Sequence, residues 1–111
     1  MITILVVGPP DRELSEFAAV HPSLEIVLAS GPDEALERLA RNRRIDAVLL
    51  LPGTPARDVA EAIAEEDPGA PPVFAPWEAG RIAGVETAPE SFRSPAELAA
   101  FVTGKLSPEA P

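Results

Sequence analysis

Five short apolar runs alternate along the chain with stretches that repeat apolar residues at helical spacing. The first run, residues 2–7, is almost wholly apolar, which predicts a strand covered on both faces. Glu25 interrupts the second run, 24–29, which therefore predicts a strand nearer a sheet edge. The third run, 47–51, holds only apolar residues and predicts another central strand. This alternation is typical of βα units built on a mainly parallel sheet.

The starts of the helices are marked by residues that suit a first helical turn. One helix is expected from about Asp11, and Pro32 suits the first turn of the next. The pair Thr54-Pro55 can cap a third helix. The tetrapeptide Ser94-Pro95-Ala96-Glu97 is a capping box with proline at the first helical position, which predicts a last helix.

The segment between the fourth and fifth strands departs from this pattern. Residues 67–76 are proline-rich and leave room only for a short fourth strand near 73–75. Residues 77–84 are too few and too rich in glycine for a full helix, so a single turn or a loop is expected there. A short fifth strand is then expected near 85–88.

Size and composition limit the chain to one domain and exclude several classes of function. Its 111 residues, 46% of them hydrophobic, can bury a single core, which we expect over residues 1–106, followed by a linker-like tail over 107–111. There is no cysteine, which excludes disulfides, thiolate catalysis and thiolate metal sites. The apolar runs are far shorter than a bilayer span, and no targeting signal follows Met1, so a cytoplasmic location is expected.

The charge balance argues against nucleic acid and anionic membranes as partners. The formal net charge is −9, from 18 acidic and 9 basic residues. The nearest approach to a basic patch is a group of four arginines, Arg38, Arg41, Arg43 and Arg44. They fall where the second helix should end, and cations there complement the helix dipole, which explains them without a nucleic acid.

Three pieces of the sequence follow one another in an informative order: ITILVV, VLASGPDEALERLARNRRIDAVLLLPG and SPAELAAFV. In order and spacing they resemble the first strand, the second-to-third-strand block and the last helix of the receiver domains of bacterial two-component response regulators. The resemblance implies a flavodoxin-like (CheY-like) α/β three-layer sandwich with a five-stranded parallel sheet of order 2-1-3-4-5, here with the fourth helix shortened or absent. It also implies that any ligand or phosphate chemistry lies at the carboxyl ends of strands 1 and 3.

Receiver chemistry, as the resemblance implies it, needs an acidic pair after strand 1 to hold Mg²⁺ and a carboxylate nucleophile after strand 3. It also needs a hydroxyl after strand 4 and a lysine after strand 5. The corresponding positions hold Gly8 and Pro9, Leu51, Ala75 or Pro76, and Glu90 or Ser91. Every one departs from the family pattern, so we expect a pseudo-receiver that is not an enzyme, takes no cofactor and binds no Mg²⁺.

One candidate site competes with a plain structural interpretation. Thr54 and Arg57, with Ser30 from a neighbouring loop, could bind a small anion at a helix start, which would make the chain a ligand or anion sensor. The competing interpretation is that Ser30, Thr54 and Ser94 are N-caps. His21, the only histidine, rules out a catalytic triad or a multi-histidine metal site and is expected at the surface.

A candidate interface is formed by Trp77, Ile82 and Phe92 together with the last helix. Trp77 either covers the core where the fourth helix is missing or serves as an exposed anchor for a partner. We favour a non-catalytic regulatory module that binds a protein partner or forms a homodimer independently of phosphorylation. Such a module would be part of a larger signalling or assembly protein.

Overall fold

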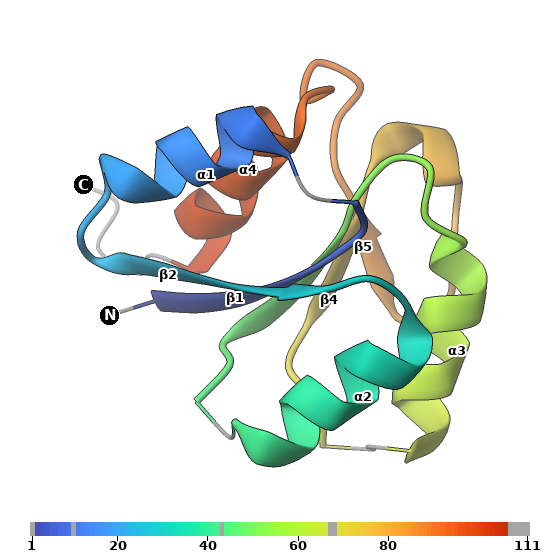
Figure 1. Ribbon diagram of the computed structural model, residues 1–111. Helices are drawn as coiled ribbons and strands as arrows, with labels where there is room; N and C mark the ends of the chain where they lie inside the picture. The colour runs from blue at the N-terminus through green and yellow to red at the C-terminus, as the bar shows by residue number, and fades with distance from the viewer. Residues whose placement is uncertain (1, 10, 43, 67–68, 107–111) are drawn as a thin grey trace.

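A computed structural model describes residues 2–9, 11–42, 44–66 and 69–106 (Figure 1); the tail predicted over 107–111 lies outside them. The strands are β1 (Ile2–Val7), β2 (Leu24–Ala29), β3 (Ala47–Leu50), β4 (Val73–Ala75) and β5 (Val85–Thr87). The helices are α1 (Arg12–Ala19), α2 (Pro32–Arg41), α3 (Ala56–Glu66), the 3₁₀ turn η1 (Trp77–Ala79) and α4 (Pro95–Leu106). All strand pairs are parallel, in the order β2-β1-β3-β4-β5, which confirms the predicted sheet.

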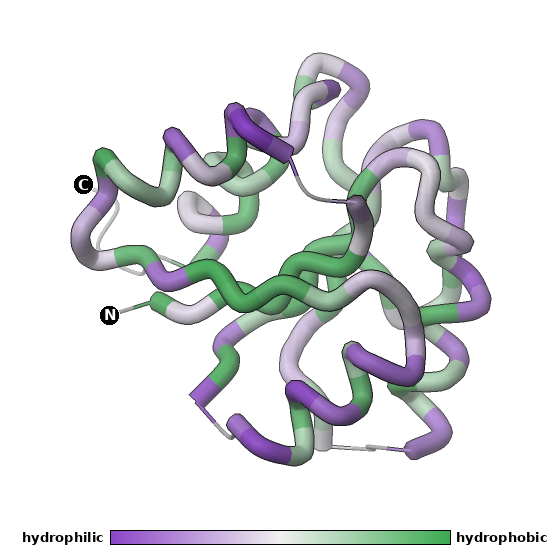
Figure 2. Tube along the Cα trace, viewed as in Figure 1, coloured by the Kyte–Doolittle hydropathy of each residue, from purple (hydrophilic) through white to green (hydrophobic). Residues whose placement is uncertain are grey.

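The sheet separates two helical layers, as Figure 1 shows: α1 and α4 cover one face, and α2 and α3 cover the other. Successive side chains of a strand point to opposite faces, so β1 supplies both cores. Leu5 and Val7 join the core on the α2 and α3 side, whereas Ile4 and Val6 join the core under α1 and α4. Figure 2 shows the resulting band of hydrophobic residues through the middle of the molecule. The first and third apolar runs are central strands, as predicted.

Two helices start where they were predicted, and Ser94 and Glu97 also form the predicted capping box. The Asp11 carboxylate accepts the Leu14 amide at 2.9 Å and caps α1. Ser94 and Glu97 form the reciprocal bonds of a capping box at α4, with the Glu97 amide donating to Ser94 Oγ at 3.1 Å and the Ser94 amide donating to Glu97 Oε1 at 3.0 Å. The N-cap of α2 is Gly31, so the prediction that Ser30 is an N-cap is wrong.

The connection from β4 to β5 replaces a crossover helix with one 3₁₀ turn and an extended segment. This confirms the predicted shortening of the fourth helix. Ile82, on the extended segment, is only 6% exposed and belongs to the core beside α2 and α3, so it supplies apolar contacts that a helix would otherwise provide. Its prediction as an exposed interface residue is therefore wrong. The Thr87 hydroxyl donates to the Gly80 carbonyl at 3.2 Å and ties the segment to β5.

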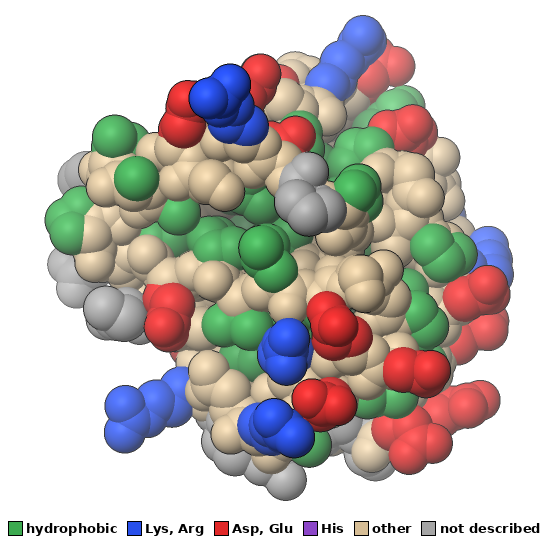
Figure 3. Space-filling model, viewed as in Figure 1, with side chains coloured by type: hydrophobic (Ala, Val, Ile, Leu, Met, Phe, Trp, Pro, Cys, Tyr) green, Lys and Arg blue, Asp and Glu red, His purple; other side chains and the backbone are tan. Residues whose placement is uncertain are grey.

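Strand β2 is one edge of the sheet, as Glu25 predicted. Leu28 is exposed on it, and Figure 3 shows hydrophobic side chains gathered along the middle of this face, between charged side chains of the helices. Arg38 Nε, from α2, donates to the Leu28 carbonyl at 3.3 Å and so occupies one acceptor of the edge. None of the helices in the described ranges is long and apolar enough to cross a membrane.

Candidate functional site

The carboxyl ends of β1 and β3 meet at Gly8 and Leu51, the residues that follow the two strands. The Leu51 amide donates to the Val7 carbonyl at 2.9 Å, which fixes the two strand ends side by side. Gly8 has a φ of +150°, a conformation that side-chain-bearing residues rarely adopt. A Cβ added at Gly8 would lie 2.8 Å from Leu51 Cβ and 3.0 Å from Thr54 Oγ1. The side chain of Leu51, 2% exposed, thus occupies the space beside Gly8.

Thr54 forms hydrogen bonds to residues at the carboxyl ends of both β1 and β3. Its hydroxyl donates to the Val7 carbonyl at 3.2 Å, and its amide donates to the Leu51 carbonyl at 3.2 Å. The hydroxyl therefore ties the loop after β3 to the end of β1 and does not cap α3, which begins two residues later. The N-cap interpretation is thus wrong for Thr54 and correct for Ser94.

The ends of β4 and β5 are also apolar. Ala75 ends β4, and its carbonyl accepts the amide of Ala88, the first residue after β5, at 2.8 Å. Glu90 and Ser91, the residues predicted at the lysine position after strand 5, lie exposed two and three positions beyond Ala88.

The donor groups at these strand ends do not fit the Mg²⁺ that active receivers hold. Mg²⁺ prefers carboxylate oxygens, and the residues after β1 and β3 are Gly8, Pro9 and Leu51, which carry none. Asp11 is the nearest acidic residue along the chain, and its carboxylate caps α1. In the part of the chain that the structure describes, no group of three or more His, Cys, Asp or Glu side chains is arranged to hold a metal ion.

The three residues of the predicted anion site are engaged in separate contacts. Ser30 borders a hollow of about 420 Å³ at the start of α2, whose other lining residues include the acidic Asp33, Glu34 and Glu37. Neither Thr54 nor Arg57 lines this hollow, and its carboxylates would repel an anion. Arg57 reaches in another direction, with its guanidinium 3.5 Å from the Arg81 carbonyl. The geometry gives an anion no shared site between them.

Trp77 and Phe92, in contrast, lie together. They line a surface hollow of about 330 Å³ with Pro76, Glu78, Glu90 and Arg93, which we call the Trp77 hollow. Trp77 is 56% exposed, so the interpretation that it covers the core is wrong. Phe92 is half-buried, with its ring centroid 5.1 Å from that of Phe101 on α4. Of the predicted interface residues, the structure brings these two to one surface and places Ile82 inside the core.

No protein-family model matches the sequence, and no curated protein matches it at a significant level. Solved structures do match. The chemotaxis response regulator CheY4 of Vibrio cholerae has a TM-score of 0.69 at 15% identity, over 96% of this chain and 99% of that one. A response regulator receiver modulated diguanylate cyclase from Pelobacter carbinolicus has a TM-score of 0.55 at 14% identity, over 96% of both chains.

A third likeness is to a chain in the crystal structure of the phosphorylated P1 domain of CheA3 in complex with CheY6 from R. sphaeroides. Its TM-score is 0.58 at 18% identity, over 95% of this chain and 96% of that one. Identities this low show a shared fold and carry no activity across. Together with the strand order, they show that the chain has the CheY-like receiver fold.

Proposed function

We propose that this chain is a regulatory module of receiver type that works through a protein partner and independently of phosphorylation. The observation that carries the proposal is the pairing of Gly8 with Leu51. An acyl phosphate requires a carboxylate nucleophile, and the strand end where the fold would place one holds a buried leucine packed against a glycine.

The neighbouring positions support the same proposal. Ala75 and Ala88 offer neither a hydroxyl nor an ammonium group at the ends of β4 and β5. The only lysine of the chain, Lys105, lies on α4 and pairs with Glu86 of β5 at 3.2 Å. A phosphoryl group at the end of β3 would therefore meet apolar side chains without neutralising charge.

A protein partner is supported by the intact scaffold and by the structural neighbours. One neighbour is known as a complex of CheY6 with the P1 domain of CheA3, and another is named as a receiver that modulates a cyclase. The first name describes a complex of two proteins, and the second describes a cyclase that a receiver modulates. The present chain has the same fold, and its Trp77 hollow presents two aromatic side chains to solvent.

The experiment is incubation of the chain with acetyl phosphate and Mg²⁺, followed by intact-mass measurement and sedimentation equilibrium over a concentration series. A receiver that carries the aspartate serves as the positive control. We expect no phosphoryl adduct and no change in association state, because no acceptor follows β3. An adduct that persists in an Asp11→Asn variant and alters association would overturn the proposal. An adduct that disappears in that variant would also overturn it, by placing the acceptor at Asp11.

A further inference from the structure

Two aromatic side chains, Trp77 and Phe92, form walls of the Trp77 hollow. Trp77 begins the 3₁₀ turn η1, and its carbonyl accepts the Gly80 amide at 3.1 Å, while the Pro76 carbonyl accepts the Ala79 amide at 3.0 Å. These bonds fix the backbone that presents the exposed indole. A large, rigid aromatic side chain anchors an interface at low entropic cost, and tryptophan is enriched among the residues that dominate binding energy.

The opposite wall is held from the core. The Phe92 ring packs against that of Phe101 of α4 at 5.1 Å between centroids, with the ring planes inclined by 50°, and Phe101 meets Phe74 of β4 edge-on at 6.1 Å. The Phe92 amide also donates to the Pro89 carbonyl at 3.0 Å. Because this chain of rings continues into the sheet, the wall formed by Phe92 is in place before any partner arrives.

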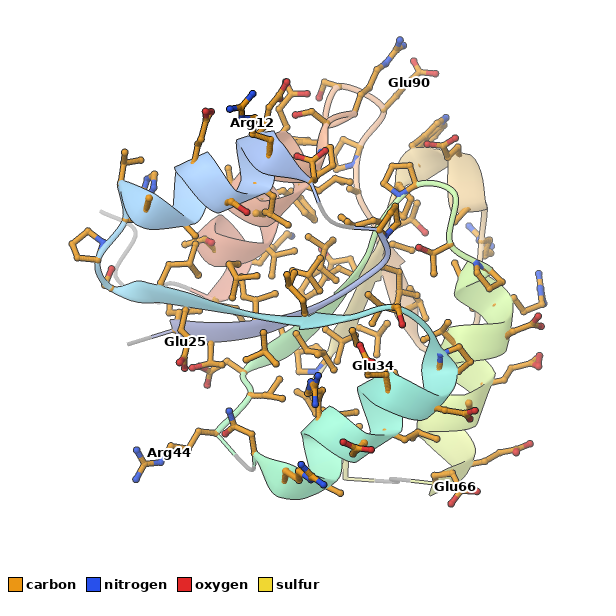
Figure 4. All side chains as sticks on the ribbon, in the orientation of Figure 1. Arg12, Glu25, Glu34, Arg44, Glu66 and Glu90 are labelled. Carbon is orange, nitrogen blue, oxygen red and sulfur yellow. The ribbon has the colours of Figure 1, made fainter. Side chains whose placement is uncertain are left out.

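The rim of the hollow is acidic. Glu78 and Glu90 border it, and Figure 4 shows Glu90 projecting from the loop before α4, away from the sheet. Neither carboxylate takes part in any ion pair found among the described residues. Arg93, the one cation of the lining, turns its Nε back to the Glu90 carbonyl at 3.2 Å. The net charge of −9 adds a long-range attraction for cationic partners.

Another hollow, of about 260 Å³, lies between α3 and the starts of β4 and β5. Its lining is wholly apolar, from Ala60 and Ile63 to Val73 and Val85, and contains no charged side chain. It therefore indicates nothing about the chemistry of an occupant. The Trp77 hollow differs because its aromatic walls and its acidic rim together specify one.

We infer that the Trp77 hollow is the docking site for the protein partner, and that the partner inserts an apolar side chain between Trp77 and Phe92 from a segment rich in lysine and arginine. The inserted side chain fills the hollow, and the flanking cations pair with Glu78 and Glu90. This inference rests on the proposed function and adds the surface and the chemistry of the partner to it.

Trp77 itself reports on the test, since it is the only tryptophan and the chain has no tyrosine. Three synthetic octapeptides serve as probes: one with a Leu-Phe pair between lysines and arginines, one with the same pair between glutamates, and one with the basic residues but glycines for the pair. We expect a saturable change in Trp77 emission with the first peptide alone, at concentrations up to about 2 mM. Added salt should weaken it.

Variants then assign the surface by calorimetry with the first peptide. Trp77→Ala and the double change Glu78→Lys with Glu90→Lys should each weaken binding about tenfold or more. Matched controls are Val20→Ala, another exposed apolar residue, and Glu65→Lys with Glu66→Lys, which changes the net charge equally. Glu66 lies at the opposite end of the molecule from Glu90 in Figure 4. The controls should leave the affinity within about twofold.

Three outcomes would overturn the inference: no saturable response to any peptide, an equal response to the acidic peptide, or equal losses in the control variants. Amide chemical shifts recorded with each peptide separate this failure from failure of the proposed function. Shifts that map to another surface contradict the docking site and leave a partner-binding module in place. A phosphoryl adduct in the acetyl phosphate experiment contradicts the proposed function whatever the peptides do.

Discussion

Placing a carboxylate at the end of β3 should destabilise the fold, because Leu51 is a packed core residue. Leu51 is 2% exposed and belongs to the same buried cluster as Leu14, Leu49 and Leu98. The change Leu51→Asp removes this packing and places a carboxyl group where the strand ends offer no cation. Leu51→Asn is the matched control, since it has nearly the same shape and no charge.

The two costs can be estimated separately. Losing the buried leucine side chain should cost about 3 kcal/mol of unfolding free energy in both variants. An unpaired carboxyl group at this depth should have its pKa raised by about 3 units, and each unit corresponds to about 1.4 kcal/mol. Leu51→Asp should therefore lose about 4 kcal/mol more than Leu51→Asn at slightly alkaline pH. The two losses in Leu51→Asp together come to about 7 kcal/mol, which lies within the total stability of roughly 5 to 15 kcal/mol typical of a protein domain.

The sign of the pH dependence identifies the charge as the cause. A carboxyl group with a raised folded-state pKa is tolerated below its unfolded pKa of about 3.9, and stability is lost as pH rises from there through the folded pKa. The gap between the aspartate and asparagine variants should thus widen with pH and then level off.

Urea unfolding followed by far-ultraviolet circular dichroism measures this gap, and it should be run above the isoelectric point of about 4.5. A gap that stays constant between about pH 5.5 and pH 8.5 would refute the burial argument. A Leu51→Asp variant as stable as the natural chain would also refute the burial argument.

Three further predictions concern other parts of the fold. Gly8→Ala should lower the free energy of unfolding, measured in urea, by about 2 to 4 kcal/mol. The loss should be clearly smaller in a Leu51→Gly background, because that change removes Leu51 Cβ, the atom nearest to the added methyl group. Equal losses in both backgrounds would contradict the close approach of Gly8 and Leu51. Ile82→Ala should lower the free energy of unfolding by about 2 to 4 kcal/mol, whereas Val20→Ala, at an exposed site, should change it by no more than about 0.5 kcal/mol. Similar losses in the two variants would argue against Ile82 as a core residue. The backbone amides of Ser94 and Arg93 hold the pKa of Glu97 below its usual value, so an NMR titration should find that pKa lowered. The stability that these hydrogen bonds provide should decline as pH falls through the pKa of Glu97 in the folded protein. An ordinary or raised pKa would contradict the capping geometry.

The central part of the fold could be predicted because its sequence signals are local. Strands covered on both faces produce unbroken apolar runs, as in residues 2–7 and 47–51, and Glu25 marked the edge strand. The caps at Asp11 and Ser94 were predictable for the same reason, since each side chain bonds an amide three residues away. Strand order then followed from the resemblance of the ordered segments to receiver domains.

What the sequence did not predict depends on contacts between distant residues. Thr54 precedes a helix as a cap would, yet its hydroxyl bonds the Val7 carbonyl, which only the folded sheet brings within reach. Ile82 is the only large apolar residue between Trp77 and Val85, so no periodicity marks it as core. The exposure of Trp77 depends on how a three-residue turn sits on the sheet, and a single residue carries no pattern that would indicate it.

The ends of β1 and β3 and the Trp77 hollow differ in how readily a binding partner could act on this fold. A ligand shifts a conformational equilibrium only through contacts that differ between states. At the ends of β1 and β3, Leu51 fills the space beside Gly8 and Thr54 bonds the Val7 carbonyl, so a small ligand finds neither room nor charge there. The Trp77 hollow, by contrast, is built from the segments that follow β4 and β5, at the same end of the sheet. A partner seated in it would contact the two connections that bracket β5, which is where a binding signal could enter this scaffold without phosphate.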